Sequence, residues 1–121
     1  MLSLRSGDVK FNSGNGTSRM DVEYQLPIDF EDGWVHVALV VDREAGEVRF
    51  AYDFGEFESA KIPAELMGSH LNAFRNLNIG QDGTGKLVYG LSAVLDEFIL
   101  IDGVMTQDQL NALAEHYGAT K

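Results

Sequence analysis

Apolar and polar side chains alternate along residues 34–52 in a way that predicts a β-hairpin. Both faces of the first arm are mostly apolar: one carries Val35, Val37, Leu39 and Val41, and the other carries Trp34, His36, Ala38 and Val40. An arm with two apolar faces is expected to lie centrally in a sheet. The second arm, residues 47–53, has one apolar face and is expected to be half exposed. Residues 42–46 supply a polar loop that ends in a glycine, which suits the hairpin turn.

Shorter alternating segments on both sides of this hairpin predict further strands. They cover residues 2–5, 9–12, 19–26, 57–62, 74–80, 87–89 and 93–101. In residues 19–26 the apolar face consists of Met20, Val22, Tyr24 and Leu26. Glycine-rich turns separate the strands, and no strand–helix–strand alternation occurs. The pattern therefore predicts an all-β fold, an antiparallel β-sandwich with one short C-terminal helix.

Two helical segments are expected. Residues 63–68 predict a single turn with Pro63 at its first position. The C-terminal helix begins at Thr106, which forms a capping box with Gln109, and ends at Gly118. Its apolar stripe consists of Leu110, Leu113, Ala114 and Tyr117. We expect this stripe to dock on a sheet rather than to bind a partner, because the apolar face is narrow.

The length of the chain indicates how many domains it forms, and its net charge limits the classes of molecule it can bind. A chain of 121 residues predicts a single domain over residues 1–121. The net charge of −10 argues against nucleic acid and anionic membranes and is compatible with neutral sugars or cations. No apolar run approaches the roughly 20 residues needed for membrane insertion. The absence of cysteine excludes disulfides and thiolate metal sites.

Five motifs in register resemble the laminin G-like, concanavalin A-like jelly-roll superfamily over roughly residues 1–118. They are Trp-Val-His-Val-Ala-Leu-Val-Val-Asp at 34–42, Gly-Glu-Val-Arg-Phe at 46–50, Leu-Asn-Ile-Gly at 77–80, Leu-Asp-Glu-Phe-Ile-Leu-Ile at 95–101 and Met-Thr-Gln-Asp-Gln-Leu at 105–110. The resemblance implies a jelly-roll domain that serves as an accessory part of a larger extracellular or cell-surface bacterial protein. The chain departs from the family pattern at Val35, where a histidine is usual, and at Asp53-Phe54-Gly55, which is one residue longer than the usual turn.

Family members usually begin with additional strands before the segment that resembles residues 2–5. A sheet edge without those strands is expected to be covered by pairing. We therefore expect the missing layer to come from a second copy of the chain or from a segment absent here.

The carboxylates do not predict an enzyme. Related glucanases place two carboxylates on one strand in a Glu-x-Asp-x-x-Glu pattern, which this chain lacks. Asp96 and Glu97 are adjacent, so on a strand their side chains point to opposite faces. His36 has no nearby Ser or Cys nucleophile and is expected to be a hydrogen-bonded core residue. His70 and His116 form no ligand spacing.

Calcium is the most plausible ion, because laminin G-like domains often bind it through carboxylates and carbonyls at a loop rim. Asp82 and Asp96 are the candidate ligands, and Asp29, Glu31 and Asp32 form a second acidic cluster. The alternative for a lone aspartate in a turn is that it only forms the turn.

Aromatic residues beside turns are candidates for stacking on sugar rings. They are Tyr52, Phe54, Phe57 and Tyr89. The alternative is that they pack into the core or its rim, where we also expect Trp34. Phe54 is the foremost candidate, because it belongs to the departure from the family turn. The sequence thus favours a non-catalytic module that binds a glycan or a protein, and the alternative is a structural or assembly domain without a small ligand.

Overall fold

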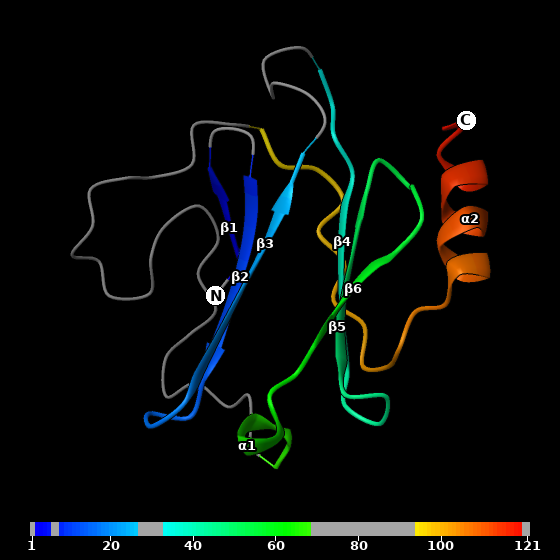
Figure 1. Ribbon diagram of the computed structural model, residues 1–121. Helices are drawn as coiled ribbons and strands as arrows, with labels where there is room; N and C mark the ends of the chain where they lie inside the picture. The colour runs from blue at the N-terminus through cyan, green and yellow to red at the C-terminus, as the bar shows by residue number, and fades with distance from the viewer. Residues whose placement is uncertain (1, 6–7, 27–32, 69–93, 120–121) are drawn as a thin grey trace. The chain divides into compact units, whose positions relative to one another are not determined.

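The computed structural model describes residues 2–5, 8–26, 33–68 and 94–119, and Figure 1 shows the elements they form. The strands are β1 (Leu2–Arg5), β2 (Asp8–Gly14), β3 (Arg19–Gln25), β4 (Val37–Asp42), β5 (Glu47–Tyr52) and β6 (Glu58–Lys61); the helices are α1 (Ala64–Met67) and α2 (Gln107–His116). The strands make two antiparallel three-stranded sheets, in the orders β1-β2-β3 and β4-β5-β6. The all-β class is confirmed.

The chain divides into two units. Met1–Ser69 and Asp102–Lys121 form the first, which holds both sheets and both helices, and His70–Ile101 form the second. Only residues 94–101 of the second unit are described. In the described part of the chain, no helix is long and apolar enough to cross a membrane. The single-domain expectation stays a prediction.

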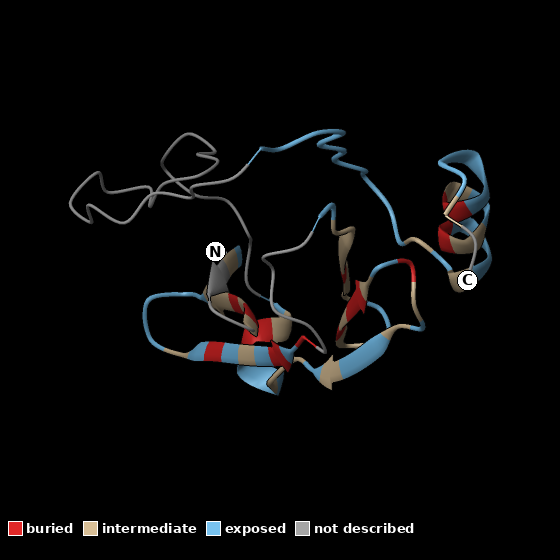
Figure 2. Cartoon of the chain, turned by 90° about the horizontal axis from the view of Figure 1, so that it is seen from above, coloured by how far each residue is buried: buried red, intermediate tan, exposed pale blue. Residues whose placement is uncertain are grey.

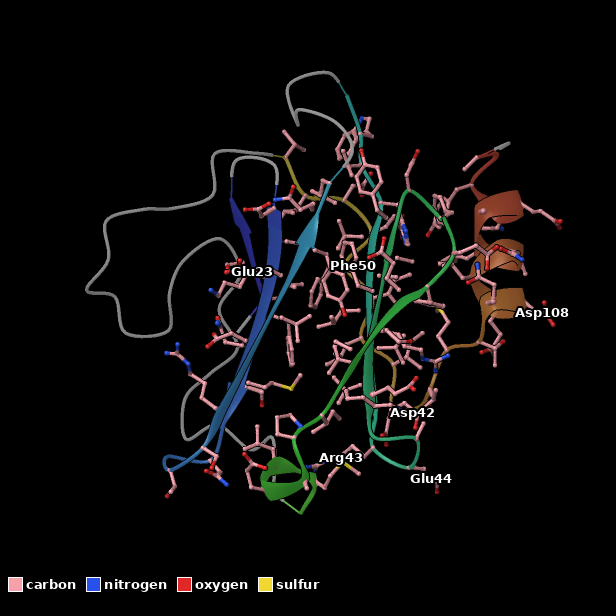
Figure 3. All side chains as sticks on the ribbon, viewed as in Figure 1. Glu23, Asp42, Arg43, Glu44, Phe50 and Asp108 are labelled. Atoms are coloured by element: carbon pink, nitrogen blue, oxygen red, sulfur yellow. The ribbon has the colours of Figure 1, made fainter. Side chains whose placement is uncertain are left out.

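The apolar faces of the two sheets pack against each other, as the buried residues in Figure 2 indicate. The ring of Tyr24 on β3 stacks on that of Phe50 on β5, with centroids 4.6 Å apart, and Figure 3 labels Phe50. The Tyr24 hydroxyl donates a hydrogen bond of 3.2 Å to the Val48 carbonyl oxygen. Around these residues lie Val9, Phe11, Met20, Leu26 and Leu66. The face predicted for residues 19–26 is confirmed, because Met20, Tyr24 and Leu26 are buried.

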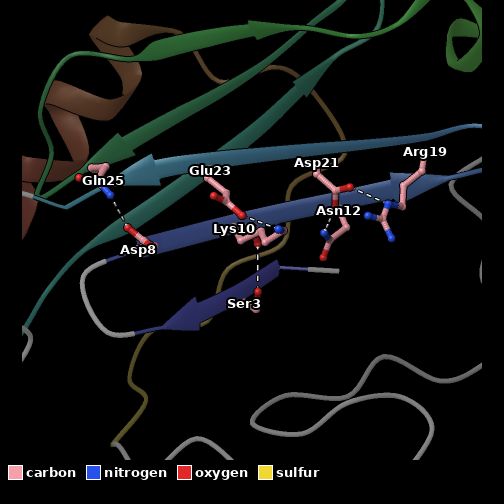
Figure 4. Close-up of polar contacts among 8 residues, drawn as sticks. All are labelled: Ser3, Asp8, Lys10, Asn12, Arg19, Asp21, Glu23 and Gln25. Atoms are coloured by element: carbon pink, nitrogen blue, oxygen red, sulfur yellow. Dashed lines mark hydrogen bonds and ion pairs between the residues drawn. The ribbon is translucent and has the colours of Figure 1, made fainter.

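The opposite face of the β1-β2-β3 sheet is polar. Cross-strand partners in register pair their side chains there, Lys10 with Glu23 and Asn12 with Asp21 (Figure 4). Gln25 donates a hydrogen bond of 3.0 Å to Asp8 in the same way. Exposed pairs of this kind contribute little free energy, typically about 0–1 kcal/mol each. Their main effect is to fix which face of this sheet meets water.

The central hairpin is present, but its details differ from the prediction. Its turn is confirmed: Asp42 pairs with Glu47, and Gly46 has a φ of +67°. However, β4 begins at Val37, so residues 34–36 lie before the strand. The central strand is β5, and β4 lies at the edge among the described strands. The face of β5 expected to be exposed is covered at Ala51, which packs against α2, whereas Glu47 and Arg49 on the same face are partly exposed.

Helix α2 follows its prediction closely. The Thr106 hydroxyl accepts from the Gln109 backbone N–H, and the Gln109 side chain accepts from the Thr106 N–H, which completes the capping box. Leu110 and Ala114 are buried and pack on Ala51 and Phe54. Gly118 follows the helix with a φ of +67°. The expected docking of the helix on a sheet is confirmed, although Tyr117 at the end of the stripe is exposed.

Two other predictions need correction. Pro63 precedes α1 as its N-cap rather than occupying its first position. The strand predicted over residues 93–101 is wrong in its described part, because residues 94–101 have no regular secondary structure and are all exposed. Glu97 there has a φ of +51°, which interrupts an extended strand. The strands predicted at 74–80 and 87–89 lie outside the described residues.

Candidate functional site

The turn after β5 contains two consecutive non-glycine residues with positive φ. Asp53 and Phe54 have φ values of +46° and +57°, a conformation that non-glycine residues seldom adopt. The Asp53 N–H donates a 2.8 Å hydrogen bond to the His36 carbonyl oxygen, and the Gly55 N–H donates one of 2.8 Å to the Tyr52 carbonyl oxygen. Residues 53–54 therefore form a left-handed turn that is hydrogen-bonded to the residue before β4.

This turn directs Phe54 inward. The Phe54 side chain is 7 % exposed and packs with Ala51, Leu110 and Ala114. One face of its ring is covered by the His36 imidazole, at 3.8 Å between centroids and an interplanar angle of 11°. A sugar ring would need that face to be free. Phe54 is thus a core residue in this structure, which agrees with the alternative given for the turn aromatics, and its ring is not exposed for stacking on a sugar.

His36 is half-buried, and its Nδ1 atom is buried without a hydrogen-bond partner among the described residues. Burial lowers the pKa of His36, and the nearby Asp53 carboxylate opposes that shift. We expected a hydrogen-bonded core histidine. The burial is confirmed only in part, and the described part of the chain supplies no hydrogen bond to Nδ1.

The other aromatic candidates are also engaged in packing. Tyr52 is half-buried and lies against the core that contains Phe50. Phe57 is half-buried, and the Arg49 guanidinium lies 5.3 Å from its ring centroid. Its backbone N–H donates to the Gln107 side chain at 3.1 Å. Tyr89 lies outside the described residues. Phe57 packs against the buried cluster that contains Phe54, and Tyr52 lies against the other core, so the three described candidates do not form one exposed surface.

Trp34 is the aromatic residue that sequence reasoning placed wrongly. Its side chain is 70 % exposed, although we expected it in the core. The β4–β5 ladder ends at Val37, and the last backbone hydrogen bond beyond it joins Asp53 to His36, so Trp34 lies past the covered part of the sheet. Gly33 before it has a φ of +117°. The glycine directly before the arm was the available signal that the strand starts later.

The acidic candidates do not form a cluster where they are described. Asp96 is exposed, and its side chain accepts a 2.9 Å hydrogen bond from the Glu97 N–H. Asp82 and the acidic residues Asp29, Glu31 and Asp32 lie outside the described residues. Within the described ranges, no group of three or more His, Cys, Asp or Glu side chains lies close enough to hold a metal ion.

The first unit therefore contains an exposed indole, that of Trp34, and a buried aromatic ring in a turn, that of Phe54. The half-buried His36 lies two residues after Trp34 and stacks on Phe54. Asp53, whose side chain is exposed, adds a carboxylate beside His36. An exposed indole offers a flat apolar face, and a carboxylate can accept hydrogen bonds. Comparison with protein-family models, curated proteins and solved structures finds no match for this chain.

Proposed function

We propose that this chain is a non-catalytic recognition module that binds a neutral glycan on the indole of Trp34. The observation that carries the proposal is the 70 % exposure of that side chain. Tryptophan is highly buried on average, so an indole left largely in water is unusual. Its flat apolar face matches the apolar face of a pyranose ring, and aromatic walls with a few polar groups are typical of ligand sites.

One polar group for sugar hydroxyls, the Asp53 carboxylate, belongs to the turn that is hydrogen-bonded to the residue before β4. Asp53 is hydrogen-bonded through its N–H to His36, which is two residues after Trp34, and its carboxylate is exposed. A carboxylate can accept hydrogen bonds from hydroxyl groups. The combination of one stacking surface and one acceptor suits a single sugar ring.

The charge of the chain favours an uncharged ligand. With a net charge of −10, the surface repels sulfated, phosphorylated or uronic acid polymers. Neutral hexose or pentose oligosaccharides carry no such penalty. They are the ligand class we propose.

The proposal includes the architecture and setting implied by the resemblance. Two antiparallel sheets with apolar faces in contact agree with a laminin G-like jelly-roll sandwich, acting as an accessory domain of an extracellular or cell-surface bacterial protein. The same resemblance extends the proposal to a calcium ion on Asp82 and Asp96. Binding is therefore to be measured with and without calcium.

Because Trp34 is the sole tryptophan, its fluorescence reports directly on the proposed site. We expect a panel of neutral oligosaccharides to contain members that shift its emission to shorter wavelength in a saturable way. Calorimetry should then give at least about tenfold weaker binding for Trp34→Ala, because removing a central aromatic contact costs roughly 1–2 kcal/mol or more.

Tyr117→Ala is the matched control, since Tyr117 is an exposed aromatic on another element. Its affinity should equal that of the unchanged chain. If no glycan shifts the emission under either calcium condition and a glycan array retains none, the glycan proposal is wrong. Equal affinity of the Trp34→Ala variant would instead place the ligand elsewhere.

A structural or assembly role is the second candidate, favoured by the apolar side chains exposed along residues 94–101. They are Val94, Leu95, Phe98, Ile99, Leu100 and Ile101, each at least half exposed. Contiguous exposed apolar surface of this kind often marks a protein interface. Oligomers without any glycan binding would favour this candidate over the first.

A further inference from the structure

Helix α2 is held on the β4-β5-β6 sheet through the turn that contains Phe54. Leu110 and Ala114 of α2 contact Phe54 and Ala51 in one buried cluster. The Phe54 ring is also stacked on the His36 ring, with centroids 3.8 Å apart and an interplanar angle of 11°. Phe54 therefore connects the residue before β4 with the C-terminal helix, and His36 lies at the end of that connection.

The position of His36 suits the neutral imidazole and not the imidazolium. Both ring nitrogens of an imidazolium are hydrogen-bond donors, but Nδ1 is buried and has no acceptor among the described residues. The Phe54 ring offers a cation only the attraction of its face. An unpaired buried donor and a desolvated charge both cost free energy, so protonation favours an arrangement in which Nδ1 reaches water.

We propose that His36 is an acid-sensitive latch, in which protonation separates the imidazole from Phe54 and loosens the docking of α2. This inference does not depend on the proposed glycan site. The Asp53–Phe54 turn contributes, because its left-handed backbone is a conformation that non-glycine residues keep only when the surrounding packing supports it.

Charged groups around His36 decide the direction of the effect. Among the described residues, the Asp53 carboxylate in the turn favours the charged imidazole, and burial outweighs it, so the pKa of His36 is lowered. The ionisable residues of α2, Asp108, Glu115 and His116, are exposed. Because the folded-state pKa is below the unfolded value of about 6.5, the stabilisation is complete above that pH and is lost as the pH falls below it.

Hydrogen exchange of α2 at about pH 7.5 and about pH 5 tests the latch. After correction for intrinsic rates, residues 107–116 should exchange at least about threefold faster at the lower pH, relative to β2 and β3 in the same molecule. In His36→Phe, which keeps a stacked ring that cannot titrate, this relative change should disappear.

His116→Gln is the matched control, because it removes an exposed histidine from α2 itself. It should leave the pH response unchanged. A response that persists in His36→Phe, disappears in His116→Gln or is absent from the unchanged chain would overturn the proposal. If His36→Phe does not fold, NMR titration of His36 in the unchanged chain decides, since a midpoint at or above about 6.5 contradicts the latch.

Discussion

Leu110 of α2 is fully buried and packs against Ala51 and Phe54. The docking of α2 therefore depends most directly on this residue. We expect Leu110→Ala to lower the free energy of unfolding by about 2–5 kcal/mol, the cost of losing buried methyl groups and leaving a cavity. Urea unfolding followed by circular dichroism measures this change.

Leu113→Ala is the matched control, since Leu113 lies on the same helix but is only half-buried. This substitution should lower the free energy of unfolding by clearly less than Leu110→Ala does. Equal losses for the two variants would mean that α2 does not dock through the face that contains Leu110.

Sequence patterns predicted the burial of core residues better than that of the candidate site residues. Met20, Tyr24 and Leu110 are buried as their periodicity indicates. Trp34 was misplaced and the direction of Phe54 was left open, because both lie just outside a strand, where alternation no longer fixes direction. A left-handed turn directs Phe54 inward, and the late start of β4 leaves Trp34 outside.

At the scale of elements, the start of α2 is fixed by the capping box of Thr106 and Gln109. We expect Thr106→Ala to reduce stability by about 1 kcal/mol, because one N-terminal N–H loses its acceptor. Thermal and urea unfolding should both report the loss. Thr106→Ser keeps the hydroxyl and should restore most of the stability.

Local sequence signals were sufficient to predict those strands and helices whose position depends mainly on neighbouring residues. Caps, glycine turns and alternation gave β1, β3, β5, β6 and α2 within a few residues. Residues 94–101 show the limit of such signals. Their β-branched and aromatic composition favours a strand, yet a strand also needs a hydrogen-bonded neighbour, and none is paired with them among the described strands.

The order of strands within a sheet could not be read from local pattern either. Two apolar faces on residues 34–41 predicted a central strand, whereas β5 is central. Helix α2, distant in sequence, covers the outer face of that sheet at Ala51. The two apolar faces of residues 34–41 therefore reflect packing against the helix as well as against the other sheet, and not a central position in the sheet.

The exposed apolar residues of 94–101 favour association between copies of the chain, whereas the net charge of −10 opposes it. Charge repulsion opposes contact between copies, and salt screens it, with a Debye length of about 10 Å at 0.1 M and about 3 Å at 1 M. We expect the average mass in sedimentation equilibrium to rise with salt, and Leu100→Asp to suppress the rise, because Leu100 is 82 % exposed.

Thr17→Asp adds the same charge at an exposed loop position and should behave like the unchanged chain. A chain that stays monomeric at every salt concentration would contradict self-association through residues 94–101. An equal effect of the two variants would indicate that net charge alone controls the mass.

The exposed position of Trp34 also determines which probes can follow denaturation. An indole that is already hydrated in the native state has a red emission maximum before any denaturant is added, so unfolding should barely change its colour. The stacked Tyr24 and Phe50 rings, in contrast, lose their asymmetric surroundings when the sheets separate. Near-ultraviolet dichroism of these rings is therefore the appropriate monitor of unfolding.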